Sequence, residues 1–188
     1  MDHLERLEGD LSFVRGALDT SMRSKSPSAL YVLWAVIVLI GFALVDFQAD
    51  LVPVFWAVAA PAGFVASAYL GWRHARRIGQ ASASDGRRYL LHWGAVLVVV
   101  ALAVLLGTGR AMPSGTLHTM ILLLLSLGYF TAGLHLDRSF LWVGLLMGAG
   151  SAVVTVVPLY AWTAVGIALA VSLTVAGMRE GRSREATT

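Results

Sequence analysis

Two histidines, His92 and His135, are the residues whose type and spacing could best support chemistry. His92 lies near the start of one apolar segment and His135 at the end of the next, so antiparallel helices would place both imidazoles at a similar depth. The pair could bind haem b through its two axial positions. It could also begin a divalent-metal site with Asp137. The alternative is that both histidines lie at a membrane interface and bond to water and lipid head groups.

A second candidate site, for an external cation, combines two carboxylates with an imidazole. Asp46 and Asp50 border the loop after the first apolar segment, and His118 begins a later one. Carboxylate and imidazole together suit several divalent metals. The two aspartates share a helix face only if the helix continues through Asp50. Loop polarity and helix capping are the alternative roles.

No catalytic motif accompanies these residues. The chain has no cysteine, which excludes disulfides, thiolate metal sites and thiol nucleophiles. The sequence also lacks a Ser-His-Asp set, a phosphate-binding loop and an HExxH motif. The sequence therefore favours a protein without enzymatic activity. Haem or a divalent metal is the only cofactor that its residues indicate.

The segments that must position these residues are strongly apolar. Hydrophobic residues make up 57% of the 188 residues and charged residues only 13%, against about 25% charged in soluble domains. Six stretches approach the roughly 20 apolar residues that a membrane span needs. They lie at 29–46, 51–72, 89–107, 115–135, 139–157 and 159–178. The sequence thus predicts an all-α, polytopic bundle of six transmembrane helices in three hairpins, because most links are short. Residues 1–28 precede the bundle and residues 179–188 form a tail.

The basic residues are distributed very unevenly about these spans. Thirteen of the fourteen Lys and Arg residues fall on one side, and Arg110 alone falls on the other. By the positive-inside rule both termini are cytoplasmic. The link after the second span carries five arginines: Arg73, Arg76, Arg77, Arg87 and Arg88. We expect them to set the topology and to contact lipid phosphate, since the chain lacks the modules that read nucleic acid.

An amphipathic helix is predicted before the first span. Its apolar residues recur at spacings of three and four, which is the heptad pattern of a packing seam: Leu4, Leu7, Leu11, Val14 and Leu18. The helix could lie on the membrane or on the protein's own cytoplasmic loops. It could instead dock on a membrane-complex partner or form a homodimer with a second copy.

The predicted spans carry no Asp, Glu, Lys or Arg near their middle. This argues against proton-driven transport and voltage sensing, but it leaves room for a channel lined by carbonyls or hydroxyls. Ser126, Tyr129 and Thr131 of the fourth span are expected to form hydrogen bonds between helices.

Small residues follow one face of the fifth span at spacings of four, three and four: Gly144, Gly148, Ser151 and Thr155. Such a stripe lets two helix backbones approach closely. We expect it to pack against the small face of the sixth span, formed by Gly166, Ala170 and Thr174. Homodimerisation through the same stripe is the alternative.

Three segments resemble parts of a group of small bacterial inner-membrane proteins with no assigned activity. They are LSFVRGALDTSMRSKSPSALYVLWAVIVLIGFAL near the N-terminus, the basic GWRHARRIG, and MILLLLSLGYFTAG in the fourth span. In that group an amphipathic helix precedes the first span. The resemblance implies a six-helix layout in a bacterial inner membrane, and it transfers no functional residue.

Three functions fit these features. The first is a structural or regulatory membrane protein that docks a partner through its N-terminal helix, as the heptad stripe and the apolar interior indicate. The alternative is a channel or transporter for a small solute, favoured by Pro53 and Pro61 in the second span and by the glycine-rich later spans. The third is a membrane protein that binds haem or a metal.

Overall fold

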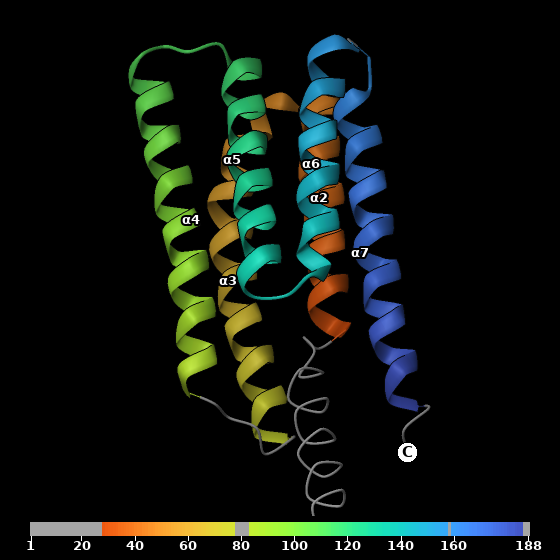
Figure 1. Ribbon diagram of the computed structural model, residues 1–188. Helices are drawn as coiled ribbons and strands as arrows, with labels where there is room; N and C mark the ends of the chain where they lie inside the picture. Colours follow the sequence, from red (N-terminus) through yellow and green to blue (C-terminus); the bar gives the residue numbers. More distant parts are fainter. Residues whose placement is uncertain (1–27, 78–82, 158, 186–188) are drawn as a thin grey trace, which may run out of the picture.

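A computed structural model describes residues 28–77, 83–157 and 159–185 of the chain, and every regular element in these ranges is helical (Figure 1). The elements are α2 (Ser28–Phe47), the short 3-10 helix η1 (Ala49–Leu51), α3 (Val52–Arg77), α4 (Ala83–Gly109), α5 (Ser114–His135), α6 (Ser139–Val156) and α7 (Ala161–Glu185). Successive helices alternate in direction. The ends of α3, α5 and α7 therefore lie at the same end of the bundle as the starts of α4 and α6 (Figure 1).

In the described part of the chain, six helices are long and apolar enough to cross a membrane, which confirms the six predicted spans as helices. The chain thus has the makeup of a multi-pass membrane protein. Three helices exceed their predicted spans, because α3 reaches Arg77, α4 begins at Ala83 and α7 reaches Glu185. A span predicted from hydropathy ends at the first charged residue. The helix itself continues further, because arginine and alanine are strong helix formers and extend the backbone hydrogen bonds. The arginine-rich link expected at 73–88 is therefore mostly helix.

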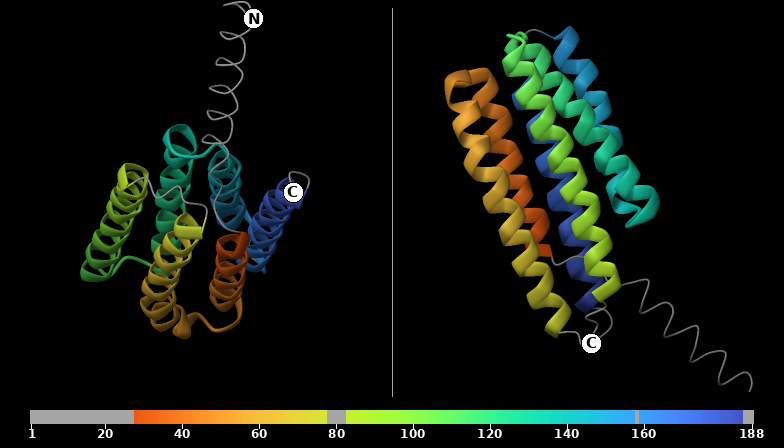
Figure 2. Two further views of the ribbon diagram at one scale, coloured as in Figure 1. Left: turned by 90° about the horizontal axis from the view of Figure 1, so that it is seen from below. Right: turned by 90° about the vertical axis from the view of Figure 1, so that its left-hand side faces the viewer.

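The helices pack as an open arc in the order α3, α2, α7, α6, α5, α4 (Figure 2). Contacts join α2 to α3, α4 to α5 and α6 to α7, but the most extensive ones join α2 to α7 and α5 to α6. Among the described residues, α3 and α4 make no backbone contact with each other, although they are consecutive. Each of these two helices has backbone contacts with a single neighbouring transmembrane helix.

Close packing of α2 against α7 depends on glycine. A Cβ added at Gly166 would lie 2.7 Å from Cβ of Phe42, and one added at Gly177 would lie 3.0 Å from Cβ of Tyr31. Neither approach leaves room for a larger residue. The glycines of the last helix therefore let the first helix approach it closely.

The hydrophobic core belongs to four helices, α2, α5, α6 and α7. Its buried side chains are Tyr31, Ala35, Val38, Phe42, Leu122, Val143, Met147, Val165, Leu169 and Leu173. Leu122 and Leu169 are the largest fully buried side chains among the described residues. Helices α3 and α4 flank this four-helix core, and Trp56 of α3 packs against its edge. The outer faces of both flanking helices expose apolar side chains, as expected of surfaces in contact with lipid.

Pro61 lies inside α3 without interrupting it. Pro53 is the second residue of the same helix, where a missing N–H leaves no hydrogen bond unmade. The second span is therefore one continuous helix despite its two prolines.

Candidate functional site

Side-chain hydrogen bonds tie neighbouring helices together at several points. The Trp34 indole Nε1 of α2 donates to Ser67 Oγ of α3 at 2.9 Å. The Ser126 hydroxyl of α5 donates to the Gly144 carbonyl of α6 at 2.8 Å. The expectation of a hydrogen bond between helices is confirmed for Ser126. Thr131 instead donates back to carbonyls of its own helix.

His92 also serves as a link between helices. Its Nε2 lies 3.0 Å from the Gly128 carbonyl oxygen of α5, so the imidazole donates a hydrogen bond with its proton on Nε2. The ring also meets Trp93 edge-on, with centroids 5.3 Å apart. Since α5 is the one helix with which α4 has backbone contacts in the described ranges, this bond helps to attach a lateral helix to the rest of the bundle.

The proposed haem and metal ligands each make hydrogen bonds that hold them within the helical framework. His135 Nδ1 lies 3.0 Å from the Thr131 carbonyl oxygen of its own helix. Asp137 accepts hydrogen bonds from the backbone N–H of Ser139, at 2.9 Å, and from its hydroxyl. Within the described ranges, no group of three or more metal-ligating side chains occurs. Each proposed ligand has a structural partner of its own.

The candidate external cation site is only partly assembled. Asp46 Oδ2 accepts hydrogen bonds from the backbone N–H and the hydroxyl of Thr163, both at 2.7 Å. His118 meets the neighbouring Trp162 edge-on, with ring centroids 5.9 Å apart. Helix α2 ends at Phe47, and Asp50 lies exposed in η1. The two aspartates therefore do not share a helix face.

Asp46 fits the capping role that the sequence left open. Its carboxylate lies at the first turn of α7, where backbone N–H groups have no partner within the helix. The positive end of the helix dipole also favours a negative charge there. The carboxylate thus joins the end of the first span to the start of the last one.

An aromatic cluster joins three helices near His92. The ring of Trp93 in α4 lies 4.8 Å from that of Tyr129 in α5 and 5.8 Å from that of Phe140 in α6. Tyr129 and Phe140 are themselves 5.8 Å apart. All three pairs have the edge-to-face geometry that stabilises aromatic contacts. Sequence reasoning missed this cluster, because its members become neighbours only through the packing of α4, α5 and α6.

The two glycines of the small-residue stripe of α6 face α5 rather than α7. A Cβ added at Gly144 would lie 2.7 Å from the backbone N of Phe130, and one at Gly148 would lie 3.0 Å from Ser126 Oγ. Further along, the Ser151 and Thr155 hydroxyls donate to carbonyls of their own helix. The expected pairing of the stripe with the sixth span was wrong for Gly144 and Gly148. It is Gly150, outside the stripe, that meets Val165 of α7.

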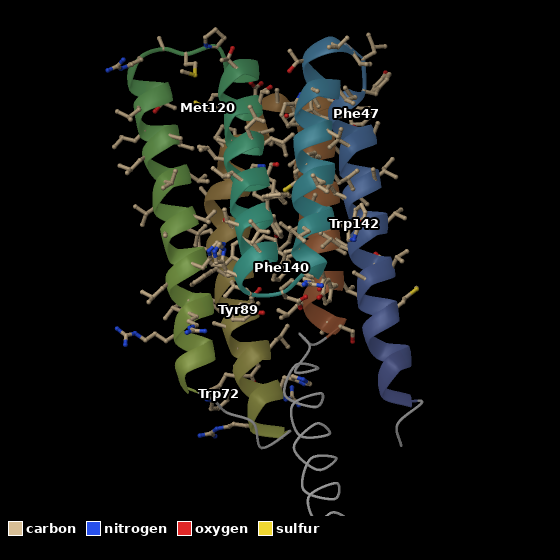
Figure 3. The ribbon with its side chains drawn as sticks, viewed as in Figure 1. Phe47, Trp72, Tyr89, Met120, Phe140 and Trp142 are labelled. Carbon is tan, nitrogen blue, oxygen red and sulfur yellow. The ribbon has the colours of Figure 1, made fainter. Side chains whose placement is uncertain are left out.

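The arginines gather where α3 ends and α4 begins. Arg73, Arg76, Arg87 and Arg88 are exposed, and Arg77 lies in α3 with a side chain outside the described part. The Arg76 guanidinium carbon lies 4.2 Å from the centroid of the Trp72 ring, a cation–π contact. Figure 3 shows Trp72 near the lower end of α3 and Tyr89 on the lower part of α4.

The proposed docking helix lies outside the described residues. This applies to all five members of its stripe, Leu4, Leu7, Leu11, Val14 and Leu18. Their role stays a prediction from the heptad spacing.

No protein-family model matches the chain, and neither a curated protein nor a solved structure matches it significantly. The resemblance to small bacterial inner-membrane proteins therefore stays a prediction from three sequence segments.

Proposed function

We propose that this chain is a non-catalytic docking protein of a bacterial inner membrane, with a structural or regulatory role and with both termini in the cytoplasm. The observation that carries the proposal is the packed core of α2, α5, α6 and α7, in which Leu122 and Leu169 are fully buried. Such a core makes a stable membrane anchor. The part that binds a partner is then the N-terminal heptad stripe.

The charge distribution supports the proposed orientation. The alternating helices bring Arg76, Arg87 and Arg138 to one end of the bundle, and Arg110 lies beyond the other end of α4. The end that collects the arginines is the one that the positive-inside rule keeps in the cytoplasm. The N-terminal segment leads into α2 from this same end, so its stripe would meet partners there.

Disulfide cross-linking in membranes tests the docking proposal, because the natural chain has no cysteine. A single Leu18→Cys reporter in the seam should give a cross-linked species, either a dimer or a complex with a partner that carries a cysteine. Adding Leu7→Asp, Leu11→Asp and Val14→Asp places three carboxylates in the seam, whose packing requires apolar side chains. We expect this variant to lose the cross-linked species.

A matched control puts the same three charges off the stripe, as Gly9→Asp, Ser12→Asp and Gly16→Asp. This control should keep the cross-link, since the apolar seam remains intact. The proposal fails if the seam variant cross-links as well as the control does. It also fails if neither protein yields a cross-link while both insert normally in the membrane.

A second candidate function is passage of a small neutral solute. It is favoured by the separation of α3 from α4, each of which has backbone contacts with only one neighbouring span in the described ranges. Liposome swelling with glycerol and urea as probes tests this candidate. Swelling no faster than in protein-free liposomes would exclude passage of these solutes.

A further inference from the structure

One exposed stripe runs along α3 and changes its chemistry from one end to the other. Its members recur at spacings of three, four and seven residues, so they lie on one helix face: Val54, Val58, Val65, Tyr69, Trp72 and Arg76. The exposed fractions are 65% for Val54, 65% for Val58, 66% for Val65, 55% for Tyr69 and 53% for Trp72. Since α3 packs against α2 and η1 only, no other helix of the described part covers this face.

The aromatic residues of the stripe hold the Arg76 guanidinium in place. The rings of Tyr69 and Trp72 lie 6.2 Å apart at an interplanar angle of 34°. Arg76, one turn further on, rests on Trp72 with its guanidinium carbon 4.2 Å from the ring centroid. A contact with a ring face uses none of the guanidinium N–H donors. These donors stay available for an anion, and phosphate fits their fork-like geometry.

Further positive charge lies close to Arg76. Arg73 is exposed one turn earlier on α3, and Arg87 and Arg88 are exposed near the start of α4. Only residues 78–82 separate the two helices, so six residue steps join Arg77 to Ala83 and span at most about 22 Å. The chain itself therefore keeps the arginines of both helices at the same end of the bundle.

We propose that the outward face of α3 binds one anionic phospholipid of the surrounding bilayer. Arg76 and Arg73 hold the phosphate, Tyr69 and Trp72 lie at the level of the glycerol esters, and an acyl chain follows Val65 and Val58. This sequence of apolar, aromatic and cationic groups matches a phospholipid from its tail to its head. A helix of another protein would need carboxylates opposite the arginines, and a free phosphate would not use the valines.

Lipid binding to the purified full-length chain tests this proposal by native mass spectrometry in detergent. The probes are phosphatidylglycerol, phosphatidylcholine with the same acyl chains, and soluble glycerol phosphate. We expect tighter binding of phosphatidylglycerol than of the other two. Arg76→Gln should weaken phosphatidylglycerol binding about fivefold, which corresponds to about 1 kcal/mol for one charge near a head group. Arg138→Gln is the matched control and should change little.

Two further variants separate the tail and ring contributions. Val65→Asn places an amide against the acyl chain, so it should weaken binding of phosphatidylglycerol and leave that of glycerol phosphate unchanged. Trp72→Leu removes the ring under Arg76 and should lower the preference for phosphatidylglycerol over phosphatidylcholine, whereas Trp72→Phe should retain most of it.

Three outcomes would overturn the proposal. The first is equal phosphatidylglycerol binding by the wild type and Arg76→Gln. The second is competition by glycerol phosphate as strong as that by the whole lipid, which would indicate a head-group site alone. The third is efficient disulfide cross-linking of a Val58→Cys variant in liposomes, which would show that a second copy covers this face.

Discussion

The Asp46 carboxylate at the end of α2 caps the first turn of α7 through Thr163. One carboxylate oxygen accepts both the backbone N–H and the hydroxyl of this threonine at 2.7 Å. The two residues are 117 positions apart in the sequence. The contact therefore joins the first and last spans, at the end of the bundle away from Arg76.

Removal of this cap should destabilise the bundle. Asp46→Ala leaves the Thr163 N–H without its acceptor, and loss of a capping side chain costs about 1 to 2 kcal/mol. We expect that decrease in the free energy of unfolding, measured by titration with SDS in mixed micelles. Asp50→Ala, in the exposed turn of η1, is the control and should have no measurable effect. Equal losses for the two variants would refute the capping role.

Gly144 should tolerate no larger residue. The Cβ of Gly144→Ala would lie 2.7 Å from the backbone N of Phe130, and a backbone atom cannot move aside as a side chain can. Overpacking of this kind costs about 1 to 3 kcal/mol, which the same SDS titration would detect. The matched substitution is Gly94→Ala, where an added Cβ meets nothing within 4 Å. It should leave stability unchanged or raise it by up to about 1 kcal/mol.

His92→Ala should loosen α4. The lost hydrogen bond to the Gly128 carbonyl joins α4 to α5, the one helix with which α4 has backbone contacts in the described ranges. Hydrogen bonds between membrane helices contribute about 0.6 kcal/mol on average and up to about 1.7 kcal/mol. We expect faster hydrogen exchange in α4 peptides and unchanged exchange in α7. His135→Ala removes a bond within its own helix and should leave α4 unaffected.

The same two variants test the haem hypothesis separately. If the histidines are axial ligands, the wild type shows a Soret band that both variants lose. If His92 has only the structural role, the absorbance spectra of all three proteins are the same and only the exchange of α4 changes.

Leu169→Ala should be among the more damaging single substitutions in the core. Leu169 is fully buried, at 0% exposure, and its truncation leaves a cavity that costs about 2 to 5 kcal/mol. Ile167→Ala is the control in the same helix, because Ile167 is 51% exposed and faces outward. The difference in SDS midpoint between the two variants measures the packing of the core. A similar loss at Ile167 would mean that a partner or a second copy covers this outer face.

The sequence alone determined the number and nature of the spans, because that property is local. A stretch of about 20 apolar residues satisfies its backbone within the membrane by forming a helix, whatever surrounds it. For the same reason the breaks near Asp50, Pro113 and Asp137 could be located closely. The helix ends at Arg77 and Ala83 could not be predicted from the sequence. Hydropathy shows where a segment leaves the hydrocarbon region, whereas the helix can continue beyond it.

Only the tertiary structure decided which helices are neighbours and therefore which residues meet. The stripe that contains Gly144 showed which face of α6 accepts a close neighbour, but α5 and α7 were equally adequate partners by sequence. The pairing of Asp46 with Thr163, and of Trp93 with Phe140, likewise depends on how the helices are arranged. A residue pattern shows which face of a helix can pack against another helix. Which helix packs there depends on the arrangement of all six helices in the bundle.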